Sequence, residues 1–148
     1  MITPYCQTDN RWRDVKIGRT HLTIGGYGCY LTCISMLDGH SPLVVNEIFT
    51  EDGVYVDGDN IPDTNYLDDY LIDGFKAAKV LGRTYQKVTV KPKVLCIAET
   101  NYYKKLGNPQ HFFVWSPDGK HTDPLTGGKP LHDYPVVSWR LFNVKNIA

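Results

Sequence analysis

The chain has 148 residues, of which 42% are hydrophobic, and its 16 basic residues balance its 16 acidic ones to a formal net charge of zero. This length supports one domain with its own core, so we expect residues 1–148 to form a single domain. The neutral charge, without a basic stripe, argues against nucleic-acid binding, and no apolar run is long enough for a membrane span or typical of a secretion signal.

The N-terminal part of the sequence predicts two short helices. Residues 2–23 have no regular pattern, and we expect Trp12 to anchor them. From Cys29 to Leu37 apolar residues recur at helical spacing, and Asp38-Gly39 is a stop signal. A second helix is predicted from Leu43 to Phe49, because Ser41-Pro42 supplies an N-cap and a favoured first residue.

The middle of the sequence predicts a turn-rich segment and a longer helix. Residues 51–65 are acidic and rich in turn formers. From Thr64 to Leu81 a helix is predicted with Gly82 at its end, and one face would hold Leu67, Leu71, Phe75 and Ala78.

The C-terminal part predicts strands. The expected strands are 86–90, 94–99, 110–115 and 136–144, with Pro92 separating the first two. A turn at 116–119 followed by residues 120–123 would make a hairpin with the third strand. Helices followed by an antiparallel sheet predict the α+β class.

Cys29 stands at the start of a predicted helix, and three of the four residues before it are glycine. A helix N-terminus favours the thiolate form of a cysteine. The glycines would let the backbone turn and leave space for a substrate chain, and the Cys29 N–H could help to bind an oxyanion. This pattern suits a nucleophile. The alternative is a small buried residue, as we expect for Cys33 one turn later.

A thiol nucleophile needs a base, and His111 is the best placed of the five histidines. It begins the apolar strand HFFVW, so its ring would be held at the end of a sheet. Strand alternation places it on one face with Phe113 and Trp115, and Phe112 and Val114 on the other. The remaining histidines lie in irregular or polar segments: His21, His40, His121 and His132.

Asp123 would return beside His111 through the predicted hairpin. A carboxylate there could bond the far imidazole nitrogen and orient the ring. The alternative is an ordinary surface pair, but the order of a Cys before a helix, a His on a strand and an Asp one hairpin later favours a triad.

Other patterns indicate neither metal nor cofactor. The acidic stretch at residues 57–63 lacks the glycine and glutamate of a calcium loop, and the four cysteines contain no C-x-x-C pair. Without an export signal we expect the cysteines to be reduced. The tyrosines at positions 66, 70, 102 and 103 favour packing over a carbohydrate platform.

Four segments together resemble the C39-like cysteine peptidases of the papain superfamily, in the short form found in bacteriophage and bacterial genomes. They are QTDNRW at residues 7–12, IGGYGC at 24–29 with Thr32 and Met36, QHFFV at 110–114, and Asp123-Pro124. They occur in the family's order. Tyr30-Leu31 stands where many relatives have Gly-Pro, and Cys33 replaces a usual serine; these departures bear on substrate fit.

The resemblance implies a papain-like fold with N-terminal helices packed on a C-terminal antiparallel sheet. It also implies roles for four residues: Cys29 as nucleophile, His111 as base, Asp123 as the residue that orients it, and Gln7 as an oxyanion donor. No transporter domain accompanies the chain, so processing of bacteriocin leaders is not implied.

The expected function is thiol-dependent peptide or amide hydrolysis through an acyl-enzyme at Cys29. For a phage-encoded form, peptidoglycan crosslinks cleaved during lysis or entry are the favoured substrate, by analogy with related phage proteins. The alternatives are a protease of a virion or host protein, and a catalytically silent binding module with the same fold. We expect the protein to be cytoplasmic when made, and carried in a virion or released at lysis.

Overall fold

The fold combines a helical part with a four-stranded antiparallel sheet, which confirms the α+β class. The computed structural model describes residues 2–57, 69–103 and 110–144. The helices are α1 (Ile24–Tyr27), α2 (Cys29–Asp38), α3 (Pro42–Glu51) and α4 (Gly74–Val80). The strands are β1 (Tyr55–Asp57), β2 (Asp69–Ile72), β3 (Arg83–Val88), β4 (Cys96–Thr100), β5 (His111–Trp115) and β6 (Val136–Val144).

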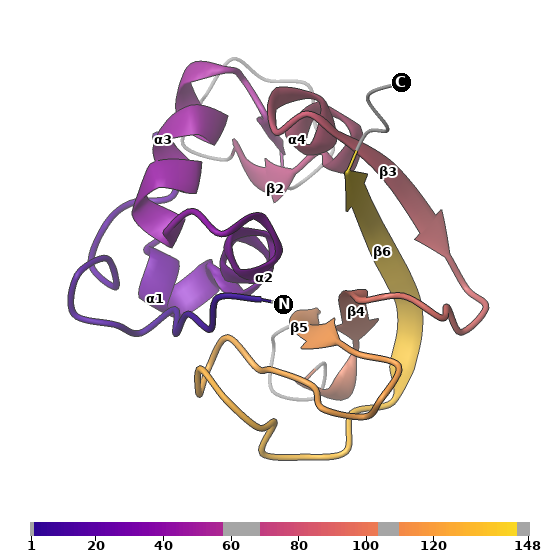
Figure 1. Ribbon diagram of the computed structural model, residues 1–148. Helices are drawn as coiled ribbons and strands as arrows, with labels where there is room; N and C mark the ends of the chain where they lie inside the picture. The colour runs from indigo at the N-terminus through magenta and orange to yellow at the C-terminus, as the bar shows by residue number, and fades with distance from the viewer. Residues whose placement is uncertain (1, 58–68, 104–109, 145–148) are drawn as a thin grey trace.

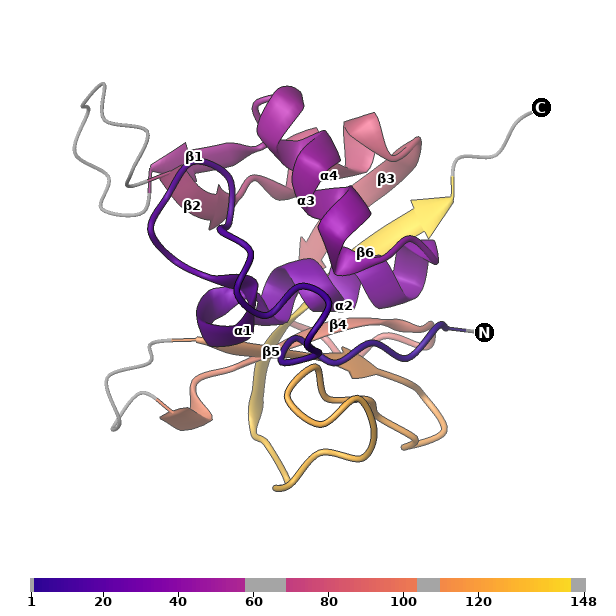
Figure 2. The same cartoon turned by 90° about the vertical axis from the view of Figure 1, so that its left-hand side faces the viewer.

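The main sheet has the strand order β3-β6-β4-β5, and each neighbouring pair is antiparallel. The strands β1 and β2 form a separate antiparallel pair. Helices α1 to α3 lie to one side of the main sheet (Figure 1). In Figure 2, α2 runs across one face of β4 and β5, while the segment 116–135 covers the opposite face. Strand β5 is therefore enclosed between a helix and a long loop.

Helices α2 and α3 begin and end close to where the sequence predicts. Gly39, with a φ of 84°, ends α2 in the left-handed conformation that glycine favours. The Ser41 hydroxyl caps α3 by accepting a hydrogen bond from the N–H of Val44 at 3.3 Å.

The predicted helix from Thr64 to Leu81 is confirmed from Gly74 to Val80 and is wrong at residues 69–72. Residues 64–68, with Leu67, lie outside the described residues, and 69–72 form β2 instead. The helix begins only at Gly74, because the Asp73 carboxylate caps it by accepting from the N–H groups of Phe75 and Lys76 at 3.0 and 3.1 Å. The proposed common face does not exist, since Leu71 and Phe75 are exposed.

The predicted strand at 120–123 is reduced to isolated bridges. Thr122 pairs with Val114, and Asp123 pairs with Gly128, but no continuous ladder forms. The turn before them is present, since Gly119 donates to the Ser116 carbonyl with a φ of 83°. This short pairing is still enough to bring Asp123 back alongside β5.

The core lies on both faces of the sheet, as the alternation along β5 predicts. Phe112 and Val114 pack into the cluster that contains α2 and α3. Phe113 and Trp115 pack into a second cluster on the opposite face, with Tyr134. In the first cluster the Tyr30 ring stacks on Phe112 with centroids 4.3 Å apart, which joins the first turn of α2 to the start of β5.

The N-terminal segment is anchored by Trp12, as predicted. Its side chain is 2% exposed, and its indole N–H donates to the carbonyl of Cys6 at 2.9 Å. In the part of the chain that the structure describes, none of the helices combines the length and hydropathy needed to cross a membrane.

Candidate active site

Cys29 is the first residue of α2, as predicted, and it is half-buried. The N–H groups in the first turn of a helix have no partner within the helix, so they are free to bind an anion. The glycine-rich stretch before Cys29 is not the open loop that the sequence suggests. It forms the helical turn α1, capped by the Thr23 hydroxyl, which accepts from the N–H of Gly26 at 3.2 Å.

Two of these glycines serve close packing rather than open space. A Cβ at Gly25 would lie 2.9 Å from the carbonyl oxygen of Arg13, and one at Gly28 would lie 2.5 Å from that of Ile24. Real Cβ atoms do not approach backbone oxygens so closely. Any larger residue at Gly28 would therefore displace the turn that fixes Cys29.

The packing of α2 on β5 places Cys29 next to His111. Tyr30 follows Cys29, Phe112 follows His111, and these two aromatic rings are stacked. The His111 ring is 4% exposed, and its Nε2 lies 3.0 Å from Oδ1 of Asp123. Since Asp123 occupies Nε2, the nitrogen left to face the thiol is Nδ1.

The pKa of His111 is raised to about 9. Burial alone would lower it, but the hydrogen bonds of the ring with Asp123 and Cys29, and the negative charges of both partners, outweigh burial. The imidazole thus remains protonated at neutral pH. A protonated ring between a carboxylate and a thiol is the charge arrangement expected of an activated cysteine.

Asp123 is fully buried and has hydrogen-bond donors at both carboxylate oxygens. Oδ1 faces His111 and also accepts from the N–H of Leu125 at 2.9 Å. Oδ2 accepts from the hydroxyl of Tyr134 at 2.9 Å. Burial would raise the pKa of Asp123, but these hydrogen bonds and the charge of His111 hold it below its usual value. The residue is therefore a stable carboxylate, not a surface pair.

Gln7 connects the two halves of the site. Its backbone N–H donates to the carbonyl of Pro124 at 2.7 Å, and its side-chain Nε2 donates to the carbonyl of Gly25 at 3.0 Å. The first contact fixes it beside Asp123, and the second fixes it beside the turn that precedes Cys29. One hydrogen of Nε2 has no acceptor in these contacts, and the side chain is 2% exposed.

All four residues predicted from the sequence therefore meet in space. Gln7 bonds the segments that carry Asp123 and Cys29, Asp123 bonds His111, and His111 interacts with Cys29. Segments separated by up to 116 positions in the chain converge on one thiol.

The other cysteines are in different environments. All four are free thiols, as expected. Burial raises the pKa of Cys33, with a further contribution from the charges of Cys29 and Asp123, and burial raises the pKa of Cys96 to about 12. Cys6 is half-buried, and its sulfur lies 3.1 Å from the Thr8 hydroxyl and 3.3 Å from the Leu125 carbonyl. Cys6 is thus the natural comparison for the reactivity of Cys29.

Three histidines that the sequence set aside have other contacts. His40, whose side chain is exposed, pairs at 2.7 Å with Asp38, whose side chain is largely buried. His121 stacks on Trp115, and His132 stacks on Tyr102. None of these contacts involves Cys29.

Sequence reasoning missed two groups that support His111. Tyr134 bonds Asp123, and no motif marks it. A hydrogen-bond network on the sheet also holds Gln110, the exposed residue before His111. Its amide donates to Glu99, while Glu99 accepts from Ser138 at 2.7 Å and pairs with Arg140 at 3.1 Å. The available signal for the network was one charged residue in each of two largely apolar strands, Glu99 in β4 and Arg140 in β6.

The described residues hold no cluster of three or more histidine, cysteine or acidic side chains that could bind a metal. Of the acidic stretch at 57–63, only Asp57 belongs to the described residues. A thiol, a protonated imidazole and a buried carboxylate in this arrangement are the groups that acyl transfer through a thioester uses.

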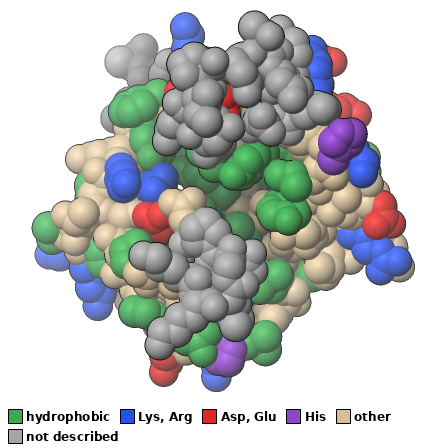
Figure 3. Space-filling view, turned by 180° about the vertical axis from the view of Figure 1, so that it is seen from behind, with side chains coloured by type: hydrophobic (Ala, Val, Ile, Leu, Met, Phe, Trp, Pro, Cys, Tyr) green, Lys and Arg blue, Asp and Glu red, His purple; other side chains and the backbone are tan. Residues whose placement is uncertain are grey.

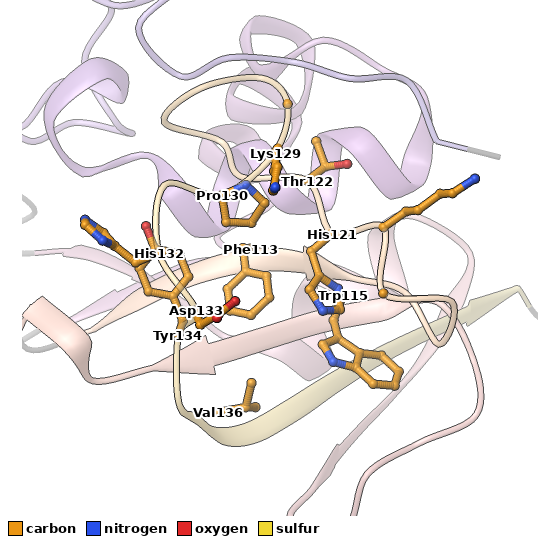
Figure 4. A pocket seen from close by; sticks show the side chains of 13 residues that line it. Phe113, Trp115, His121, Thr122, Lys129, Pro130, His132, Asp133, Tyr134 and Val136 are labelled. Carbon is orange, nitrogen blue, oxygen red and sulfur yellow. The ribbon is translucent and has the colours of Figure 1, made fainter.

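A cavity of about 560 Å³ lies beside the site, between the outer face of the sheet and the segment 116–135 (Figure 4). Its wall includes Phe113, Trp115, His121, Lys129 and Tyr134. Cys29, His111, Asp123 and Gln7 do not line it, so it is distinct from the position where a reacting carbonyl would lie. Figure 3 views the molecule from behind, on the side where α2 begins, and shows hydrophobic side chains gathered in a hollow near the middle of that face.

No protein-family model, curated protein or solved structure matches this chain.

Proposed function

We propose that this protein is a cysteine peptidase or amidase of the C39-like, papain-superfamily type, with a papain-like fold and Cys29 as its nucleophile. The observation that carries the proposal is the buried contact series from Gln7 through Asp123 and His111 to Cys29. A binding module would have no need of a buried carboxylate aimed at a protonated histidine beside a half-exposed thiol.

The first half of the reaction forms a thioester. His111 holds the proton of Cys29 on Nδ1, and the thiolate attacks the carbonyl carbon of an amide. A carbon–sulfur bond forms, and the carbonyl electron pair moves onto oxygen. His111 then donates its proton to the leaving nitrogen as the carbon–nitrogen bond breaks and an amine departs.

Two donors would stabilise the oxyanion. One is the backbone N–H of Cys29 at the N-terminus of α2, and the other is the free hydrogen on Nε2 of Gln7. The hydrogen bond of Gln7 to Gly25 fixes the amide before substrate arrives, so its reorientation costs nothing at the moment of reaction. Loss of one such donor costs about 2.7–4 kcal/mol in barrier height.

The second half of the reaction releases the acid. Water gives a proton to His111 while its oxygen attacks the thioester, and the carbon–sulfur bond then breaks to regenerate the thiolate. Asp123 stays ionised throughout and holds the imidazole in one tautomer and orientation.

For the substrate we propose peptide crosslinks of peptidoglycan, cleaved by a phage-encoded enzyme during lysis or entry. The support is the resemblance to short phage forms. The hydrophobic side chains in the hollow on the face where α2 begins (Figure 3) suit a peptide substrate.

The test is digestion of purified sacculi, followed by mass spectrometry of released peptides and detection of new free amines. We expect release with the unmodified protein and none with Cys29→Ala, while Gln7→Ala retains roughly 0.1–1% of the rate. Cleavage of an unfolded protein substrate but not of sacculi would support peptidase activity and contradict peptidoglycan as the substrate. No cleavage of either, with Cys29 unreactive, would favour a binding module.

A further inference from the structure

Tyr134 holds the one carboxylate oxygen of Asp123 that His111 does not contact. Its hydroxyl donates to Oδ2 at 2.9 Å, while Oδ1 takes His111 at 3.0 Å and the N–H of Leu125 at 2.9 Å. With donors at both oxygens, the carboxylate cannot rotate about its bond to Cβ without breaking a buried hydrogen bond. Such a break is costly where no water replaces the lost partner.

Tyr134 is itself fixed on several sides. Its side chain is 9% exposed, and its ring contacts the rings of His111 and Phe113 with centroids 5.3 and 5.4 Å away. The hydroxyls of Tyr103 and Tyr134 lie 3.0 Å apart. Because Tyr134 gives its proton to Asp123, the donor in the second contact is Tyr103. The Tyr103 hydroxyl therefore donates to Tyr134, and the Tyr134 hydroxyl donates to the Asp123 carboxylate.

The phenol is a permanent donor. Burial, with the hydrogen bonds to Tyr103 and Asp123 and their charges, raises the pKa of Tyr134 far above its ordinary value. The hydroxyl thus keeps its proton wherever the protein is folded. The ring also forms part of the wall of the cavity under the segment 116–135 (Figure 4), and this segment carries both Tyr134 and Asp123.

We propose that Tyr134 is a positioning residue that locks the Asp123 carboxylate, so that His111 presents Nδ1 to Cys29 in a single orientation. The catalytic role of Tyr134 rests on the proposed function, whereas the hydrogen bond between Tyr134 and Asp123 does not depend on it. Tyr134 acts in two ways. It fixes the plane of the Asp123 carboxylate, and the hydrogen bond from its hydroxyl stabilises the ionised form.

The experiment compares Tyr134→Phe with Tyr103→Phe, which keeps the bond between Tyr134 and Asp123 and serves as the matched control. One readout is the titration of the Asp123 carboxyl carbon by NMR. The other is the rate of Cys29 alkylation by iodoacetamide between pH 3 and pH 7. Both variants remove one hydroxyl from the same hydrogen-bonded pair, so a purely packing effect would be similar in the two.

In Tyr134→Phe we expect the Asp123 titration to move up by about one pH unit, since one hydrogen bond to a charged group is lost. The acid limb of the pH profile of Cys29 alkylation should move up by a similar amount, because a protonated Asp123 no longer holds His111. Tyr103→Phe should move neither by more than about 0.3 pH units. Equal shifts in both variants, or none in either, would overturn the proposal.

Two further results separate the possible failures. If Cys29 in the unmodified protein reacts no faster than Cys6, the proposed function fails, while the Asp123 titration still tests Tyr134. If Tyr134→Phe does not fold, the unmodified protein must show a slowly exchanging low-field hydroxyl proton with a nuclear Overhauser contact to the His111 ring. Absence of that signal would contradict the inference.

Discussion

His111 remains protonated to high pH because a buried carboxylate and a thiol both face its ring. The positive charge lies in a protein interior, where it would be unfavourable without these partners. The stability of the fold therefore depends on this proton, and so does the reactivity that we propose for Cys29.

The folding free energy should thus depend on His111 in a pH-dependent way. The folded pKa of about 9 lies above the reference value of 6.5. The stabilisation is complete below pH 6.5 and is lost as the pH rises through 9. The destabilisation caused by His111→Gln should be larger at pH 6 than at pH 10, by up to about 3 kcal/mol.

Urea unfolding of both proteins at pH 6, 8 and 10 measures this difference. His40→Gln is the control, because the His40 side chain is exposed and Arg83 also pairs with Asp38, so the carboxylate keeps a partner when His40 is replaced. An equal cost of His111→Gln at pH 6 and pH 10 would show that the imidazole is not held as a cation.

Residue identity and order were enough to select four residues that the structure brings together. Cys29, His111 and Asp123 each occur in a local context that suits their chemistry, and Gln7 stands in a recognisable opening motif. Tyr134 could not be found in this way. Its contact with Asp123 depends on the path of the loop at 116–135, which has no regular pattern to reveal it.

At the scale of elements, α2 depends on the two glycines that flank it, for opposite reasons. Gly28 has an ordinary φ of −89° but no room for a Cβ, whereas Gly39 has ample room but a φ of +84°. One position is limited by packing and the other by backbone conformation.

Gly28→Ala should destabilise the fold by about 2 kcal/mol or more and slow the alkylation of Cys29, because the α1 turn must move away from the new methyl group. Gly39→Ala should cost about 1–2 kcal/mol from the left-handed conformation alone and leave Cys29 unchanged. Urea unfolding and the alkylation rate at pH 6 measure both effects. Equal alkylation rates in the two variants would contradict this account of how Cys29 is held.

Elements with complete local signals were predicted well. The Ser41-Pro42 cap, the Gly39 stop and the apolar run of β5 each specify their structure within a few residues. The helix predicted from residue 64 is absent at residues 69–72 because β2 pairs there with β1, whose paired residues lie 12 to 17 positions earlier. Asp73 is the N-cap of the observed helix and could have marked its start. Apolar residues at helical spacing on both sides of Asp73 favoured a longer helix instead.

For the whole molecule, the site exists only because the helical layer and the sheet are packed together. The stack of Tyr30 on Phe112 joins the two layers directly next to Cys29 and His111. Gln7 joins the N-terminal segment to the loop that follows β5. The sequence predicted the layers and the partners, but the contacts that align them depend on packing between distant segments.

The central claim is that Cys29 and His111 act as one unit, and selective alkylation tests it most directly. Limiting iodoacetamide at pH 6, followed by peptide mapping, compares all four thiols in one experiment. The account predicts that Cys29 reacts at least about tenfold faster than Cys6, that Cys33 and Cys96 stay unmodified, and that His111→Ala abolishes the selectivity. Equal labelling of Cys6 and Cys29, or a Cys29 rate unchanged in His111→Ala, would contradict it.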